Sequence, residues 1–195
     1  MKKITLLLIS LLLATSLFAA ELQHTAGGAV GIYMNLGDVL LQDSGKQELL
    51  ATLGIAAGPV YDLTVKTDSV LAYGARARAD FLISNGEKYN FYEMDLFAGP
   101  KGTVNLFGRA RLNLAIGATL GYSDYNNFKT SEEKISKTFS WGVGTDVYVD
   151  VDITDNFGMG LGYLGKINFD FKHAPNKDDC LLLSSDIYLS GYYKF

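Results

Sequence analysis

From Thr25 to the C-terminus, hydrophobic and polar residues alternate with a period of two, and almost no helical periodicity is present. The alternation runs in segments of ten or more residues, which polar stretches rich in Asp, Asn, Gly, Ser and Lys separate. A period of two places successive side chains on opposite faces of a β-strand. The pattern therefore predicts an all-β protein, built as a meander of consecutive antiparallel strands.

Eight such segments follow one another along the chain. The fifth has the longest clean alternation, from Arg109 to Tyr122. Eight consecutive strands with both chain ends on the same side predict an eight-stranded antiparallel up-and-down β-barrel. The turn-forming stretches that separate the segments are 43–46, 66–69, 85–86, 100–102, 124–137, 154–156 and 173–176.

The predicted connections differ in length. Those at 100–102 and 154–156 are short, whereas those at 37–48, 124–137 and 172–179 are longer. With the termini in the periplasm, the short turns face the periplasm and the long loops face outward, as in outer-membrane barrels. Asn85 and Gly86 form a strong hairpin signal, so the connection between the third and fourth strands departs from this rule.

Alternation alone does not tell which face of the strands points inward, because a secreted lipocalin-like barrel also has eight strands. Glycine on a solvent-facing strand costs backbone entropy, whereas a narrow lumen needs small residues. The polar face is therefore predicted to line the lumen of a transmembrane barrel. Its glycines are Gly27, Gly31, Gly54, Gly58, Gly74, Gly117, Gly121, Gly142, Gly144, Gly158, Gly160 and Gly162.

Aromatic residues on the apolar face gather towards the strand ends, while the strand centres carry Ala, Leu, Val, Ile and Met. Ordinary β-propensity would scatter the aromatics along the strands. Two aromatic girdles around an aliphatic band are typical of a barrel in a bilayer. The predicted membrane-interface aromatics are Tyr73, Phe81, Tyr122, Phe139, Trp141, Phe157, Phe169, Phe171, Tyr193 and Phe195.

The last strand ends on an aromatic residue, with Ile187, Leu189, Gly191, Tyr193 and Phe195 at alternate positions. This ending resembles the C-terminal insertion signal of bacterial outer-membrane proteins. Together with the 154–156 turn, it resembles the small outer-membrane barrels of the OmpX, OmpA and OmpW type, in the cell envelope of Gram-negative-type bacteria. The resemblance implies outer-membrane lipids and the outer-membrane insertion machinery as partners. Such barrels are membrane anchors, surface-interaction proteins or narrow pores, so the resemblance leaves the role open.

The first twenty residues have the order of a secretory signal peptide. Lys2 and Lys3 precede an apolar run over 4–13, and small residues follow, among them Ala19 and Ala20. We therefore predict a cleaved signal peptide over 1–20 and one barrel domain over 21–195. No later run of about eighteen apolar residues is present, so the sequence predicts no transmembrane helix.

The charge balance and the cysteine count bear on partners and on disulfide bonds. Of 17 basic and 21 acidic residues, Lys2 and Lys3 fall in the predicted signal peptide, which leaves a mature charge of 15 − 21 = −6. Nothing in this balance favours a nucleic-acid partner. Cys180 is the only cysteine, so the chain forms no intramolecular disulfide.

Charges on the polar face change sign from strand to strand and lie at comparable depth. The interior of an eight-stranded barrel is just wide enough for its own side chains, so these charges are expected to pair across the lumen. A structural plug is the favoured interpretation, and a gate or a polar pore lining is the alternative. The predicted lumen ion-pair network is Arg76, Arg78, Glu93, Asp95, Arg109, Arg111, Asp146, Asp150, Lys166 and Asp186.

Catalytic and cofactor chemistry finds little support in the sequence. The two histidines, His24 and His173, are predicted at opposite ends of the barrel, so they cannot cooperate. A lone loop histidine such as His173 is usually solvated. The spacing of Asp146, Asp150 and Asp152 follows from strand geometry and needs no metal. We therefore predict no enzymatic activity, no catalytic residue, no metal and no cofactor.

These features predict a structural or surface-interaction role with a narrow, charge-filled lumen. A narrow channel for small solutes, as OmpW-like relatives would imply, is the alternative, and a lipid-modifying enzyme is a third, less favoured one. The longest loop, 124–137, mixes aromatics such as Tyr125 and Phe128 with charges, so it is the best candidate for binding a surface partner.

Overall fold

The structure is a computed structural model that describes residues 21–40, 47–67, 69–85, 89–127, 138–170 and 181–195. The predicted signal peptide and residue 171 lie outside these ranges. The described residues form eight strands: β1 (Leu22–Leu40), β2 (Gln47–Val65), β3 (Leu71–Asn85), β4 (Tyr89–Asn105), β5 (Ala110–Asn127), β6 (Thr138–Asp152), β7 (Phe157–Asp170) and β8 (Leu181–Lys194).

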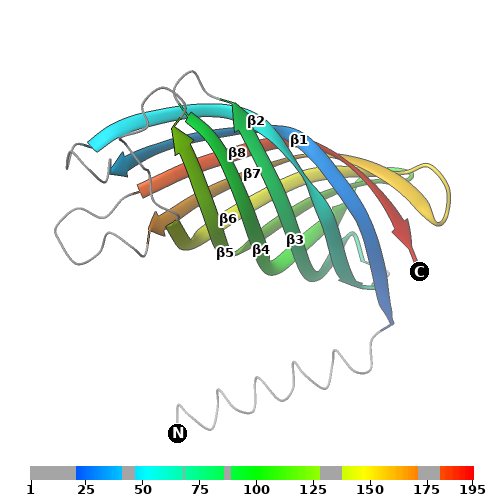
Figure 1. Cartoon of the computed structure of the whole chain (residues 1–195). Coiled ribbons are helices and arrows are strands. Elements are labelled where there is room, and N and C mark those ends of the chain that lie inside the picture. Colours follow the sequence, from blue (N-terminus) through cyan, green and yellow to red (C-terminus); the bar gives the residue numbers. More distant parts are fainter. Residues whose placement is uncertain (1–20, 41–46, 68, 86–88, 128–137, 171–180) are drawn as a thin grey trace, which may run out of the picture.

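Each strand pairs antiparallel with its neighbours in the sequence, and β1 closes the sheet by pairing with β8 (Figure 1). The predicted fold class, a closed eight-stranded antiparallel barrel, is confirmed. Closure leaves no sheet edge, because every strand has a partner on both sides. Within the described ranges no helix has the length and apolar content needed to cross a bilayer.

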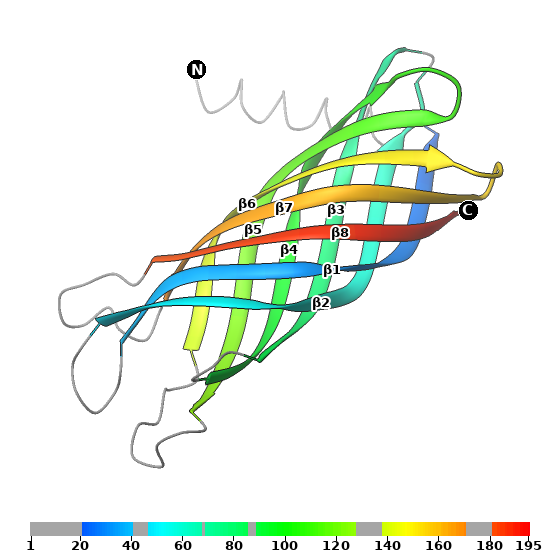
Figure 2. The same cartoon turned by 90° about the horizontal axis from the view of Figure 1, so that it is seen from above.

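Register around the barrel fixes how strongly the strands tilt. A row of direct partners that starts at Ala26 returns to β1 at Leu36, so the shear is 36 − 26 = 10 residues. A shear of this size makes the strands cross the barrel axis obliquely, which Figure 2 shows. The row passes through Tyr61, Ala77, Ala98, Ala118, Val143, Ile167 and Leu183.

The strands extend further than the sequence predicts. The predicted turn at 100–102 is wrong, because β4 continues to Asn105 and the turn lies at 106–109. Pro100 has no N–H to donate, so the pairing with β5 skips Gly99 and Pro100 and resumes at Lys101. At the real turn Gly108 has a φ of 59°, a left-handed conformation that glycine adopts without strain.

Both described ends of the chain lie at one end of the barrel, which we call the terminal end (Figure 1). The turns after β2, β4 and β6 lie there too. The opposite strand ends lead to 41–46, 86–88, 128–137 and 171–180, outside the described residues. The predicted long loops fall partly in these stretches, but residues 37–40 belong to β1, 47–48 to β2 and 124–127 to β5.

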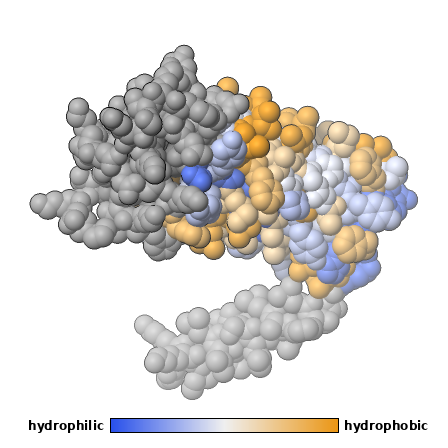
Figure 3. All heavy atoms as spheres, viewed as in Figure 1, coloured by the Kyte–Doolittle hydropathy of each residue, from blue (hydrophilic) through white to orange (hydrophobic). Residues whose placement is uncertain are grey.

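Side-chain burial in this barrel is the reverse of that in a soluble protein. Large apolar side chains point outward, among them Leu53, which is 64% exposed, and Ile55, which is 62% exposed. Buried positions instead include Arg76, Asp80 and Asp146. Hydrophobic residues gather over the barrel between its terminal end and the grey residues (Figure 3). This outward-facing surface of large apolar side chains, which we call the apolar belt, suits hydrocarbon rather than water.

Candidate functional site

Nine of the ten side chains predicted to form the lumen network point into the barrel. Eight of them are buried, and Arg111 is half-buried at the terminal end. They fall into three groups along the lumen, which we call the terminal cavity, the central plug and the outer cluster. The nine residues are Arg76, Arg78, Glu93, Asp95, Arg111, Asp146, Asp150, Lys166 and Asp186.

The central plug consists of Asp62, Arg76, Asp146, Tyr148 and Tyr188. Arg76 on β3 donates to Asp146 Oδ2 at 2.7 Å, to Asp62 Oδ2 at 2.8 Å and to the Tyr188 hydroxyl at 2.9 Å. Its guanidinium carbon lies 3.7 Å from the centre of the Tyr148 ring. Tyr148 donates to Asp62 at 3.0 Å, and Tyr188 donates to Asp146 at 2.6 Å. Side chains from four strands thus meet across the lumen, and each of the three guanidinium nitrogens of Arg76 has a hydrogen-bond partner.

The outer cluster lies on the side of the plug away from the termini. Arg78 donates to Asp80 at 2.8 Å and pairs with Asp186, while Lys166 pairs with Asp95. Tyr33 crosses the lumen to donate to Glu93 Oε2 at 2.9 Å. The outer cluster comprises Tyr33, Arg78, Asp80, Glu93, Asp95, Lys166 and Asp186, all of them buried.

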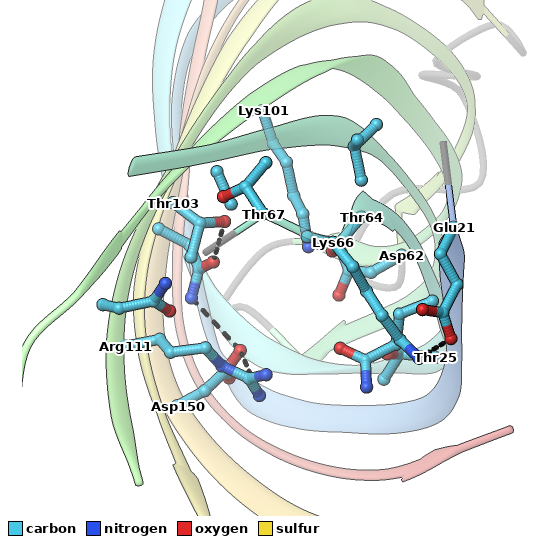
Figure 4. Close-up of a pocket in the computed structure, with 15 residues that line it drawn as sticks. Glu21, Thr25, Asp62, Thr64, Lys66, Thr67, Lys101, Thr103, Arg111 and Asp150 are labelled. Atoms are coloured by element: carbon cyan, nitrogen blue, oxygen red, sulfur yellow. Dashed lines mark hydrogen bonds and ion pairs between the residues drawn. The ribbon is translucent and has the colours of Figure 1, made fainter. Parts of the chain in front are cut away.

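The terminal cavity is a polar space of about 650 Å³ inside the barrel mouth. Figure 4 shows side chains from several strands around it, including Lys101, Arg111 and Asp150. Arg111 donates to Asp152 and to the Tyr192 hydroxyl, each at 3.0 Å. Lys101 Nζ lies 3.2 Å from Asp62 Oδ1, so the floor of the cavity shares a carboxylate with the central plug.

Arg109 does not belong to the lumen, so its assignment to the network is corrected. Its side chain is 54% exposed and contacts Asp155 Oδ1 at 3.1 Å and the Ile153 carbonyl at 3.1 Å. The reason is that β5 begins at Ala110, so Arg109 lies in the preceding turn, where strand alternation no longer applies. An exposed pair of this kind contributes little to stability.

Several lumen residues were not predicted. Tyr33, Asp80, Tyr148, Tyr188 and Tyr192 all stand on the polar face of the sequence pattern, and the prediction counted only some of the charged positions there. Their signal was therefore present in the alternation. Asp62 and Lys101 carried a weaker signal, because Pro100 suggested that its strand had ended and the second strand was drawn too short.

Nine of the ten predicted interface aromatics lie on the outer surface, and Phe171 lies outside the described residues. Phe157 and Tyr193 are register partners near the terminal end. Near the opposite end Tyr122 pairs with Phe139, with ring centres 5.1 Å apart. Trp141 and Phe169 form a second pair there, at 5.7 Å. The rings thus concentrate near the two ends of the apolar belt.

His24 is the histidine within the described residues, and it lies at the terminal end. His24 Nδ1 lies 2.6 Å from the Tyr61 hydroxyl, and its ring stacks on Phe195 at 5.8 Å. His173 lies outside the described ranges. Among the described residues no group of three or more His, Cys, Asp or Glu side chains is arranged to hold a metal ion.

Comparison with known proteins relates the chain to outer-membrane barrels by fold and not by sequence. No family model and no curated protein matches it. Neisserial surface protein A matches with a TM-score of 0.55 and 15% identity, over 89% of this chain and 97% of that one.

Two further structures are also similar. OprG from Pseudomonas aeruginosa has a TM-score of 0.48 and 12% identity, over 90% of this chain and 97% of that one. Ail of Yersinia pestis has a TM-score of 0.47 and 14% identity, over 88% of this chain and 98% of that one. The predicted resemblance to small outer-membrane barrels is confirmed as a likeness of fold.

Proposed function

We propose that this protein is an integral outer-membrane barrel with a structural or surface-interaction role and a plugged lumen. The apolar outer belt, the aromatic residues near both of its ends and the fold shared with Neisserial surface protein A support the location. With this location, both termini face the periplasm and the four connections outside the described residues face outward.

The central plug is the observation that carries a non-conducting role. Arg76 is 3% exposed and binds partners on β2, β6 and β8 at once, so its side chain spans the narrow interior. Two carboxylates neutralise the guanidinium, and two tyrosines fill the space beside it. A solute would have to separate charges that are buried away from water, which is costly.

The surface role would belong to the outward-facing connections. Loops on a rigid scaffold vary most easily and commonly carry binding function. Outer-membrane lipids would contact the apolar belt, and the outer-membrane insertion machinery would recognise β8, the strand that leads to Phe195. No catalytic role is proposed; His24, the described histidine, is bound to Tyr61 and stacked on Phe195.

A narrow channel for small solutes is the second candidate, and the terminal cavity supports it. This polar space leads from the barrel mouth as far as Asp62, so only the central plug and the outer cluster would remain to be crossed. Movement of Arg76 away from Asp146 would be the step that opens such a path.

Single-channel recording in planar bilayers tests the two candidates against each other. The plugged barrel should show no steady conductance, and Arg76→Ala should create or raise one because it removes the side chain that spans the lumen. Arg109→Ala is the matched control, since Arg109 lies outside the lumen. Steady conductance of the wild type would favour the channel. Lipid-deacylase activity of the purified protein would contradict the non-enzymatic role.

A further inference from the structure

A closed ring of polar side chains shares Glu93 with the outer cluster and otherwise lies on its side away from the termini. Each strand contributes one buried, inward side chain to it. Neighbours in the ring are direct register partners three times and are displaced by two residues five times, which gives 5 × 2 = 10, the shear of the barrel. The row therefore closes on itself. This polar ring consists of Asn35, Thr52, Ser84, Glu93, Ser123, Ser140, Asn168 and Ser184.

Unpartnered oxygens face the lumen in and beside this ring. Within the described part of the chain, Asn35 Oδ1, Thr52 Oγ1 and Ser123 Oγ have no hydrogen-bond partner, nor do Asp95 Oδ1 and Asp186 Oδ1. Each of these residues is more than nine-tenths buried. Arg78 Nη1 is the one nitrogen in the same situation among the described residues. Buried oxygens without a donor are costly, so this region favours a ligand that satisfies acceptors.

Charge in the same region points to a cation. The outer cluster holds four carboxylates, on Asp80, Glu93, Asp95 and Asp186, but only two basic groups, on Arg78 and Lys166. The inward charges nearer the terminal end balance, because four acids (Asp62, Asp146, Asp150, Asp152) face four bases (Arg76, Lys101, Arg111, Lys194). Among the described inward side chains, the surplus of two negative charges therefore lies in the outer cluster.

One wall of the ring brings three oxygens together, and a fourth belongs to a register partner of one of them. Glu93 accepts a hydrogen bond from Tyr33 through Oε2, and Asp95 accepts one from Lys166 through Oδ2, so the other oxygen of each carboxylate takes no part in these bonds. Those oxygens converge beside Gly121. A Cβ built there would lie 2.6 Å from Asp95 Oδ1, 2.6 Å from Ser140 Oγ and 3.2 Å from Glu93 Oε1. Ser123, whose hydroxyl is unpartnered, is the direct register partner of Glu93.

We propose that Glu93, Asp95, Ser123 and Ser140 bind a hard divalent cation of the calcium type inside the barrel. All four ligands are oxygens, which such cations prefer, and water completes the coordination. A divalent charge equals the local surplus. Softer metals are disfavoured, because the ring contains neither Cys nor His. The cation would join β4, β5 and β6 at the outer end of the lumen, whether or not the lumen conducts.

Terbium luminescence of the folded barrel in detergent micelles tests this site, with Tb³⁺ in place of Ca²⁺. Tyr33 lies beside Glu93, so its excitation should sensitise bound Tb³⁺. We expect a saturable signal that Ca²⁺ displaces. Glu93→Gln and Asp95→Asn should each weaken binding by about tenfold or more, because each removes a charged ligand. Asp150→Asn is the matched control, since that carboxylate lines the terminal cavity, and it should change the affinity less than about twofold.

Gly121→Ala provides a test that leaves the charges unchanged. Its methyl group would fill the point on which the oxygens converge, and the atoms that it meets are the ends of side chains, which can move. Saturable binding should be lost while the barrel still folds. The proposal is overturned if the wild type shows no saturable signal, if Asp95→Asn and Gly121→Ala bind like the wild type, or if Na⁺ displaces Tb³⁺ as effectively as Ca²⁺ at equal ionic strength.

Discussion

Gly162 on β7 leaves the space that the ring of Tyr188 occupies on β8. A Cβ built on Gly162 would lie 2.3 Å from both the ring carbon Cζ and the hydroxyl oxygen of Tyr188. The two residues are direct register partners, so the ring lies across the glycine on the inner face of the sheet. That position lets the Tyr188 hydroxyl contact Arg76 and Asp146 together. The absence of a side chain at Gly162 thus leaves room for the Tyr188 ring in the central plug.

Replacing this glycine should disturb the plug. Gly162→Ala should destabilise the barrel by about 1–3 kcal/mol, because the methyl group forces the Tyr188 ring away from its partners. Urea unfolding of the barrel in lipid vesicles or detergent measures the change. Gly191→Ala on β8 is the control, because no atom lies within 4 Å of its added Cβ. Equal stability of the two variants would contradict the packing described for Tyr188.

Arg76 should be tested by removing its charge and then restoring the balance. Arg76→Met leaves Asp62 and Asp146 buried without their shared partner, which should cost about 3–5 kcal/mol. The double variant with Asp146→Asn should recover part of this loss, because one of the stranded charges is then absent. A double-mutant cycle on unfolding free energies measures the coupling. Additive losses would mean that the ion pair at 2.7 Å has no energetic coupling.

The fold could be predicted from the sequence because each strand faces two different environments. A barrel wall with lipid outside and a polar lumen inside imposes an alternation that strands such as β5 and β6 show clearly. Closure follows from the even, unbroken series of hairpins. Strand ends were less predictable, since Pro100 and Gly102 read as a turn although the backbone there stays extended.

The details of the lumen depend on register, which alternation does not determine. Shear decides that Arg76 reaches Asp146 and Tyr188, which are 70 and 112 residues away in the sequence. Sign alternation between strands correctly suggested that charges would face one another. It could not show that tyrosine hydroxyls would join the carboxylates in the central plug, because these hydroxyls bond only where the barrel radius brings them together.

The apolar belt predicts that one isoleucine is exposed to hydrocarbon and another to water. Ile116, in the middle of β5, is 57% exposed, and Ile153, in the turn after β6, is 52% exposed. Ile116→Arg should cost about 2–4 kcal/mol in lipid vesicles, whereas Ile153→Arg should cost about 0–1 kcal/mol. Folding free energy in vesicles measures both. A soluble barrel would tolerate the two changes equally, so matching values would refute membrane insertion.

The two ends of β6 provide the sharpest test of orientation. An epitope tag at Asp155, in the turn after β6, and a tag within residues 128–137, before β6, are separated by a single strand. A strand that crosses the membrane puts its two ends on opposite sides, so only one of the tags can be reached from outside intact cells. With the termini in the periplasm, the accessible tag is the one within 128–137, and a tag after Phe195 should be protected like the one at Asp155.

Insertion at either tagged position should leave folding intact, because longer connections cost little entropy. Heat-dependent gel migration provides the folding control. Accessibility of the Asp155 tag alone would reverse the orientation, and accessibility of both tags would show that β6 does not cross the membrane.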